Sequence, residues 1–198
     1  MLIYQPFHII VFFSAFPQEL VANADFYAGG FSSRYVGRSS SVLDVKLRQG
    51  NKYEYSGSGS ISPFLGEVFV EGPLVKGRTS IVLSTRRSLI EDASKWYPSG
   101  EQPLRFDSQF LKVSYNNNAG GSCSTLLMRT YDRGRLDYEE GDAFKWNNFL
   151  IGGRCSGLSD GPISLFDVNV GFSSVSNVAG ADNIKSGGDF RYSGVGIN

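Results

Sequence analysis

The sequence predicts a mainly β chain, in which a small mixed α+β part precedes a series of antiparallel strands. Glycine accounts for 24 of the 198 residues and aromatic residues for 14%, a composition that favours turns and strands over helices. Apolar and polar residues alternate in short stretches from Lys52 onward. Helix signals are scarce: the clearest, within 14–21, predicts one short helix capped by Ser14 with Pro17 in its first turn.

The first fifty residues contain two expected strands and end in a linker. Residues 22–29 predict a strand that leads to a pair of glycines. In 41–47, Leu43 and Val45 alternate with polar residues, which predicts a second strand. The sequence Arg-Gln-Gly-Asn at 48–51 indicates a turn or linker, so we expect a domain boundary between residues 1–50 and residues 51–198.

The rest of the chain predicts eight strands, each ended by Gly, Pro, Asn or Asp. The expected ranges are 52–61, 66–71, 79–88, 107–116, 122–131, 144–155, 163–173 and 188–198. Within them, alternate positions form apolar rows, and the opposite rows carry Lys, Arg, Asp, Asn, Gly and Ser. The clearest apolar rows contain Leu111, Val113, Phe149, Ile151, Phe166, Val168, Val170 and Phe172.

Two environments suit such alternation, and the connections favour one of them. A soluble sandwich buries the apolar rows in a core, whereas a membrane barrel turns them toward lipid. The expected connections after the third strand contain 18, 5, 12, 7 and 14 residues, an alternation of long and short that is typical of outer-membrane barrels. Aromatic residues near the expected strand ends suit interfacial girdles. We therefore expect the eight apolar residues to face lipid.

Composition excludes several classes of function. The formal net charge is zero, which argues against a nucleic-acid partner because such proteins need a basic face. The chain has two cysteines and one histidine, too few for a Cys/His metal cage. We expect no cofactor. No wider cysteine framework surrounds Cys123 and Cys155, so two unpaired thiols are favoured over a disulfide.

No catalytic motif stands out, and we expect no enzyme. The glycine-rich stretches lack the spacing of a phosphate-binding loop, and His8 has no Gly-x-Ser-x-Gly partner in the sequence. The acidic run 136–142 lacks the residue order of a calcium loop, so we interpret it as a solvated loop.

Residues 26–51 carry a specific motif. They follow the pattern G-G-F-x-x-R-Y-G-G-R-x-S-S-V-L-D-V, with Val36 where the pattern has Gly. This stretch resembles the end of the plug domain of TonB-dependent outer-membrane receptors, in the branch common in Bacteroidetes-type bacteria. The resemblance is good from residue 3 to about residue 92 and continues more weakly to the end. The matching residues that we take as the plug motif are Gly29, Gly30, Phe31, Arg34, Tyr35, Gly37, Arg38, Ser40, Ser41 and Asp44.

The resemblance implies a fold and a function. A plug domain would lie inside a barrel of about 22 strands; residues 1–50 would be the later part of the plug, and residues 51–198 the first third of the wall. Arg34 and Arg38 would pair with carboxylates of the inner wall. Such a receptor, located in the outer membrane of Gram-negative cells, takes up a bulky nutrient such as a siderophore, cobalamin or glycan. Its TonB-type periplasmic partner would act through a segment that this chain does not contain.

Two other classes remain open from the sequence. One is a soluble β-sandwich that binds carbohydrate through Trp96, Tyr97 and Trp146. The other is a small, complete eight-stranded barrel with a structural role in the outer membrane. The last residue, Asn198, disfavours the second, because such barrels are expected to end on an aromatic residue.

Overall fold

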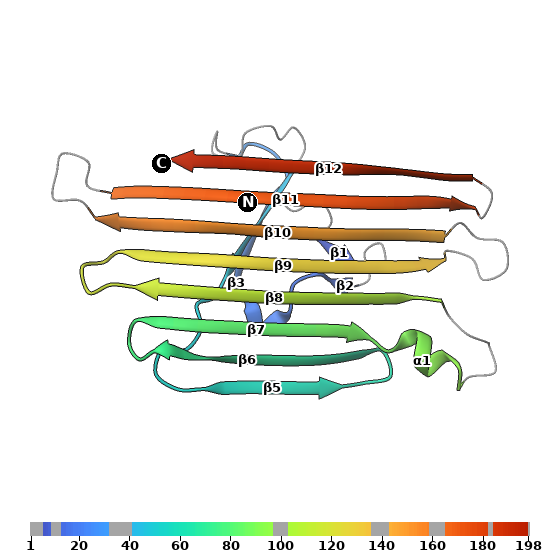
Figure 1. Ribbon diagram of the computed structural model, residues 1–198, viewed down its shortest axis with the longest axis horizontal. Coiled ribbons are helices and arrows are strands. Elements are labelled where there is room, and N and C mark those ends of the chain that lie inside the picture. Colours follow the sequence, from blue (N-terminus) through green and yellow to red (C-terminus); the bar gives the residue numbers. More distant parts are fainter. Residues whose placement is uncertain are drawn as a thin grey trace.

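The computed structural model is a large sheet crossed on one face by the N-terminal part of the chain (Figure 1). The structure describes residues 6–8, 13–31, 41–96, 103–135, 143–158, 165–181 and 184–197.

One antiparallel sheet of eight strands dominates the molecule. Its spatial order is β12-β11-β10-β9-β8-β7-β6-β5, so each strand pairs with its neighbours in sequence. Within the described residues β5 and β12 each have one partner, and the sheet is therefore open rather than closed. The strands are β5 (Ser56–Ile61), β6 (Leu65–Val75), β7 (Thr79–Ser88), β8 (Arg105–Asn116), β9 (Ser122–Arg135), β10 (Ala143–Leu158), β11 (Leu165–Ala181) and β12 (Ile184–Ile197).

The remaining elements are short. β1 (Phe7–His8) pairs with β2 (Phe13–Ser14), and β3 (Val21–Tyr27) pairs with β4 (Val42–Leu47). A 3-10 turn, η1 (Gln18–Leu20), precedes β3, and α1 (Ile90–Ser94) follows β7. Neither of these two helical elements of the described residues is both long and apolar enough to cross a membrane.

The sequence predicted the eight strands and their number correctly, but it placed several ends wrongly. β11 and β12 continue through most of the expected loop 174–187 and leave only 182–183 between them. After β7 the connections contain 16, 5, 7, 6 and 2 residues, so the expected regular alternation of long and short connections is wrong. The physical reason is that strand pairing rests on backbone hydrogen bonds, which continue through Ser, Asn, Ala and Gly after the apolar alternation ends.

The expected short helix is also corrected. Ser14 lies in β2, and its Oγ accepts a hydrogen bond from the backbone N–H of Phe16 at 3.1 Å instead of capping a helix. Pro17 has an extended conformation (ψ 139°), so helical geometry begins only at Gln18 and lasts one turn. The two strands expected in 22–29 and 41–47 are confirmed as β3 and β4.

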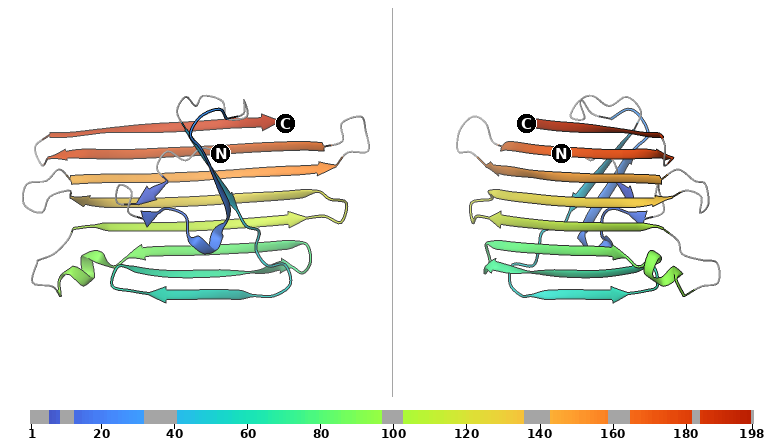
Figure 2. Two further views of the ribbon diagram at one scale, coloured as in Figure 1. Left: turned by 180° about the vertical axis from the view of Figure 1, so that it is seen from behind. Right: turned by 45° about the vertical axis from the view of Figure 1, so that its right-hand side comes forward.

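The N-terminal segment, which we define as residues 6–8, 13–31 and 41–50, lies across the strands on one face of the sheet (Figure 2). We call this the inward face and the opposite one the outward face. A hydrophobic core joins the segment to the inward face: Phe16 packs on Phe110 with ring centroids 5.8 Å apart, and Leu20 is fully buried. Gly50 permits the close approach, because a Cβ there would lie 2.8 Å from the carbonyl oxygen of Ile81.

Prediction on the core. Phe110→Ala should weaken docking of the N-terminal segment by about 3–5 kcal/mol, since it empties the site against which Phe16 packs. The adjacent Leu111→Ala is the matched control, because Leu111 lies on the outward face and contacts no part of this core. Hydrogen exchange of the β3 amides in detergent measures the effect. Equal loss of protection in both variants would contradict the assignment of the two faces.

Candidate functional site

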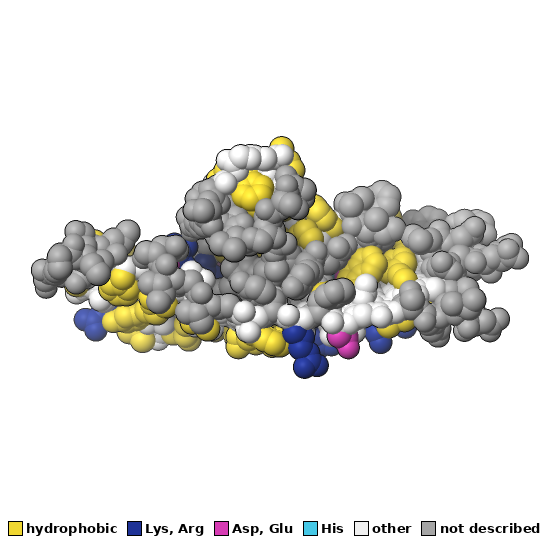
Figure 3. Space-filling model, turned by 90° about the horizontal axis from the view of Figure 1, so that it is seen from above, with side chains coloured by type: hydrophobic (Ala, Val, Ile, Leu, Met, Phe, Trp, Pro, Cys, Tyr) yellow, Lys and Arg dark blue, Asp and Glu magenta, His cyan; other side chains and the backbone are white. Residues whose placement is uncertain are grey.

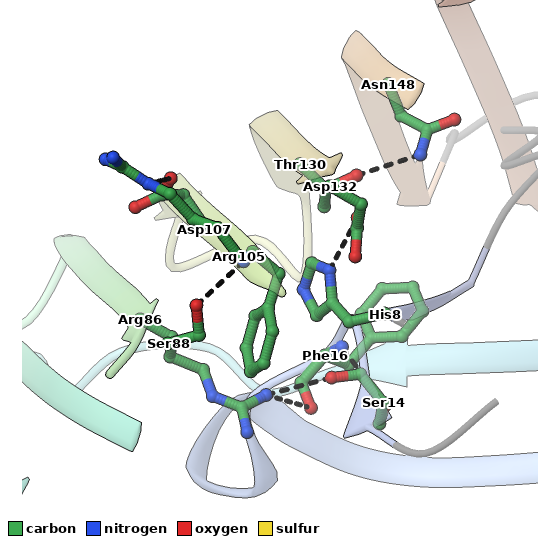
Figure 4. A network of polar contacts seen from close by, with 11 residues as sticks. His8, Ser14, Phe16, Arg86, Ser88, Arg105, Asp107, Thr130, Asp132 and Asn148 are labelled. Atoms are coloured by element: carbon green, nitrogen blue, oxygen red, sulfur yellow. Dashed lines mark hydrogen bonds and ion pairs between the residues drawn. The ribbon is translucent and has the colours of Figure 1, made fainter. Parts of the chain in front are cut away.

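Three sets of buried or partly buried polar contacts fasten the N-terminal segment to the inward face, and we call them together the polar clamp. The first is a pair formed by His8 of β1 and Asp132 of β9, both fully buried, with 2.9 Å between Nδ1 and Oδ2 (Figure 4). The imidazole ring also stacks on Phe106 with ring centroids 4.5 Å apart. A carboxylate and an imidazole removed from water need each other, so this contact fixes β1 over one point of the sheet.

The second contact starts from the sheet. Arg86 of β7 donates a hydrogen bond from Nη1 to the carbonyl oxygen of Ser14 at 2.9 Å (Figure 4). Its Nε lies 3.3 Å from Glu67 Oε2, and its side chain is 10% exposed. The guanidinium therefore joins a carboxylate of the sheet to the backbone of the segment at the end of β2.

The third contact lies at the end of β4. Lys112 of β8 donates from Nζ to the carbonyl oxygens of Leu47 at 2.7 Å and Arg48 at 2.9 Å. Arg48 in turn pairs with Glu71 of β6, which also accepts a hydrogen bond from the backbone N–H of Asn51 at 3.2 Å. These groups satisfy the backbone where the β3–β4 ladder ends, so the linker at 48–51 is held against the sheet.

Sequence reasoning missed the clamp residues, although a signal was present. Arg86, Lys112 and Asp132 occupy strand positions opposite the apolar rows, where a charged side chain faces the covered side of the sheet. The lone histidine of the chain lies in an apolar N-terminal stretch. What the sequence could not supply is the pairing, because His8 and Asp132 are 124 positions apart.

The plug motif lies only partly within the described residues. Gly29, Gly30 and Phe31 follow β3, Ser41 directly precedes β4, and Asp44 lies within β4. Gly30 has φ +65°, a left-handed conformation that glycine adopts without strain. The rest of the motif lies outside the described residues: Arg34, Tyr35, Gly37, Arg38 and Ser40. The expected ion pairs of Arg34 and Arg38 therefore stay predictions.

An exposed ion pair supports the same β3–β4 pair. Lys46 Nζ of β4 donates to Asp25 Oδ2 of β3 at 3.1 Å, and Asn23 Nδ2 donates to the same carboxylate at 2.9 Å. The hydrogen bond from Lys46, followed by that from Asn23, lowers the pKa of Asp25 below its ordinary value. Solvent screens such a pair, so we assign it no large part in stability.

The outward face carries an apolar band. Cross-strand register places Leu83, Leu111, Leu127 and Ile151 in one row across β7 to β10. Each member of the band is exposed or half-buried; Val170 is 52% exposed. In Figure 3 hydrophobic side chains gather on the side of the sheet opposite the N-terminal segment. The band consists of Val70, Ile81, Leu83, Leu111, Val113, Leu127, Phe149, Ile151, Phe166, Val168, Val170 and Phe172, and thus includes all eight residues expected to face lipid.

Trp146, one of the aromatic residues considered for carbohydrate binding, lies on the inward face of the sheet. Trp146 stacks on the buried Phe144 with centroids 4.7 Å apart, and both belong to the inward rows of β10. Trp96, by contrast, is 88% exposed after α1. Tyr97 lies outside the described residues. Trp96 and Trp146 therefore do not form one aromatic binding surface.

The two cysteines are bonded, which corrects the expectation of unpaired thiols. Cys123 of β9 and Cys155 of β10 are direct cross-strand partners with Cα atoms 4.1 Å apart. Their separation of 32 positions in sequence hid the pairing, which follows from the register of the two strands. A disulfide is typical of oxidising compartments outside the cytosol.

The search for a metal site in the described residues and the comparisons with known proteins both gave negative results. Over the described ranges, no group of three or more His, Cys, Asp or Glu side chains is arranged to hold a metal ion. Comparison with known proteins finds no match to a protein-family model, to a curated protein or to a solved structure.

Prediction on the clamp. Asp132→Ala should weaken docking of the N-terminal segment by about 1–3 kcal/mol, because it leaves the buried Nδ1 of His8 without its hydrogen-bond partner. Protease cleavage within 13–27, followed in detergent, reports the docking free energy. Asp189→Ala is the control, since Asp189 is an exposed carboxylate of another strand of the sheet. In the double variant with His8→Ala, the loss of docking free energy should be well below the sum of the losses in the two single variants. A loss equal to that sum would show that His8 and Asp132 are not energetically coupled.

Prediction on the disulfide. Peptide mapping without reductant should recover Cys123 and Cys155 in one linked peptide pair, and alkylation should require prior reduction. Reduction should destabilise the sheet by up to about 3–4 kcal/mol, because the bond closes a loop of roughly thirty residues in the unfolded chain. Rapid alkylation of both thiols in the folded, unreduced protein would refute the bond.

Proposed function

We propose that this chain forms part of the plug and wall of a TonB-dependent outer-membrane receptor, which takes up a bulky nutrient across the outer membrane. The observation that carries the proposal is the polarity of the sheet. Polar and apolar side chains are buried together on its inward face, in part beneath the N-terminal segment, while the apolar band of the outward face is exposed. A sheet in water would not leave such a band uncovered, because apolar surface must be buried whereas polar surface can remain solvated.

In this proposal lipid covers the apolar band, and the inward face lines a plugged lumen. The exposed fractions of Leu83, Val170 and Phe172 are 46%, 52% and 39%, and the register joins apolar residues into a row across the strands, so the band is a candidate contact surface for an apolar medium. The open edges at β5 and β12 fit a wall that further strands complete. The plug motif at 29–44 and the segment lying across the strands support the same arrangement.

The clamp gives the proposed receptor a physical means of holding its plug. Energy-coupled uptake requires that the plug shift or loosen when the periplasmic TonB-type partner pulls on it. The clamp consists of separate contacts that can break one at a time. Arg86 and Lys112 bind backbone carbonyls, and His8 forms a buried pair with Asp132. Such polar contacts exchange for water when the lumen opens, so the plug is held firmly without a large apolar interface.

Two alternatives are less well supported. A soluble carbohydrate-binding sandwich would need a second layer over the apolar band and a shared aromatic surface, but Trp96 and Trp146 lie apart. A small complete barrel would need pairing between β5 and β12, which occupy opposite edges of the sheet. The nutrient itself is proposed only by class: a siderophore, cobalamin or a glycan.

Prediction on the wall. In phosphatidylcholine vesicles, a nitroxide on Val170→Cys should collide often with oxygen and rarely with a soluble nickel chelate, because Val170 faces lipid. A nitroxide on Asn169→Cys, its inward neighbour, should show much lower oxygen accessibility. The native cysteines remain bonded and unlabelled. Strong chelate quenching at 170, or a folded, monodisperse chain in detergent-free buffer, would overturn the proposed wall.

A further inference from the structure

The outward face changes character toward the α1 end of the strands. Arg129 lies two residues beyond Leu127 along β9, whereas Arg87 lies four residues beyond Leu83 on β7 and Arg105 lies six residues from Leu111 on β8. Arg133 completes the group on β9. We call Arg87, Arg105, Arg129 and Arg133 the arginine face. Because two residues of a strand advance about 7 Å, the cations begin within one side-chain length of the apolar band.

The arginine face is only partly neutralised. Arg105 pairs with Asp107 at 3.3 Å, and Arg133 Nη2 donates to both carboxylate oxygens of Glu91 at 2.9 and 3.0 Å. Arg87 and Arg129 are exposed and have no acidic partner among the described residues. Four guanidinium groups thus face two carboxylates, which leaves an excess of two positive charges on this surface.

The arginine face is also hollowed. A depression of about 490 Å³ lies between these strands, large enough for a phosphate group with its attached headgroup. Side chains that can donate hydrogen bonds converge on it from three strands. It is lined by Arg87, Arg105, Asp107, Gln109, Arg129, Tyr131 and Arg133.

We propose that the arginine face binds the phosphate groups of membrane lipids whose acyl chains lie against the apolar band. This inference rests on the proposed placement of the sheet in a membrane. Guanidinium groups match phosphate oxygens in a bidentate geometry, and Arg87 and Arg129 are available for that contact. The continuity of the cations with the apolar band selects a lipid rather than a soluble anion, since one molecule satisfies both surfaces. Arginine is also costly within hydrocarbon, so the arginine face belongs at the edge of the apolar layer.

The test compares two short-chain lipids that share acyl chains. The chain, refolded in non-ionic detergent micelles, is titrated with dioctanoyl phosphatidic acid, which has an open phosphate, and with dioctanoyl phosphatidylcholine, whose phosphate is shielded by choline. We expect clearly tighter binding of the phosphatidic acid. Arg87→Gln with Arg129→Gln should weaken that binding about 30-fold, since each basic residue near an anionic lipid surface contributes about fivefold.

A charge-matched control separates local binding from general attraction. Lys46→Gln with Lys52→Gln removes two cations outside the outward face and should change the affinity by no more than about twofold. An unchanged affinity in the Arg87 and Arg129 variant would overturn the inference. So would equal binding of the two lipids, or binding of inorganic phosphate as tight as that of phosphatidic acid.

The outcomes distinguish this inference from the proposed function. A chain that folds in micelles, with Val170 facing the apolar phase, but shows no preference for phosphatidic acid, keeps its place in a membrane wall and loses the lipid-phosphate site. A chain that does not enter micelles in folded form loses both.

Discussion

The strand pleat is the constraint on which this molecule depends. Successive side chains of a strand point to opposite faces, so every strand of the sheet must satisfy two surroundings at once. Here the inward rows carry Ser, Lys, Arg and Asp together with buried apolar residues such as Phe110 and Leu150, whereas the outward rows carry the apolar band and, toward α1, the arginine face. One alternation therefore determines both which side chains the N-terminal segment can cover and which side chains stay on the exposed face.

The inward face holds the N-terminal segment through a small apolar core and the polar clamp. Its core is small, and Phe16, Leu20 and Phe110 supply much of it. Orientation comes from the charged groups, because a buried pair such as His8 and Asp132 tolerates no sideways shift, whereas apolar contacts alone permit several packings. We interpret the clamp as fixing the position of the N-terminal segment on the sheet more than as raising the free energy of unfolding. Replacing a buried polar pair by apolar side chains of similar volume often leaves that free energy unchanged.

The sequence alone was sufficient for the features that arise from local pattern. The eight strands, the outward rows of Leu111 to Phe172 and the strands before and after the plug motif all follow from alternation and turn residues. The sequence alone did not predict where strands continue beyond the apolar alternation, as β11 does through 174–181. It also did not predict contacts between residues that are far apart in the chain. The bond between Cys123 and Cys155 and the contacts of His8 and Arg86 depend on register and docking, which no single stretch of sequence encodes.

The consecutive strand order has a consequence for the order of folding. Each hairpin of the sheet forms between neighbours in sequence, so the loop-closure entropy is low at every step and the sheet can grow strand by strand. The contacts of the N-terminal segment are of the opposite kind: His8 reaches Asp132 across 124 positions, and Arg86 reaches Ser14 across 72. The segment that precedes the sheet in the chain therefore becomes ordered only after β9 has joined the sheet and created the site that receives it.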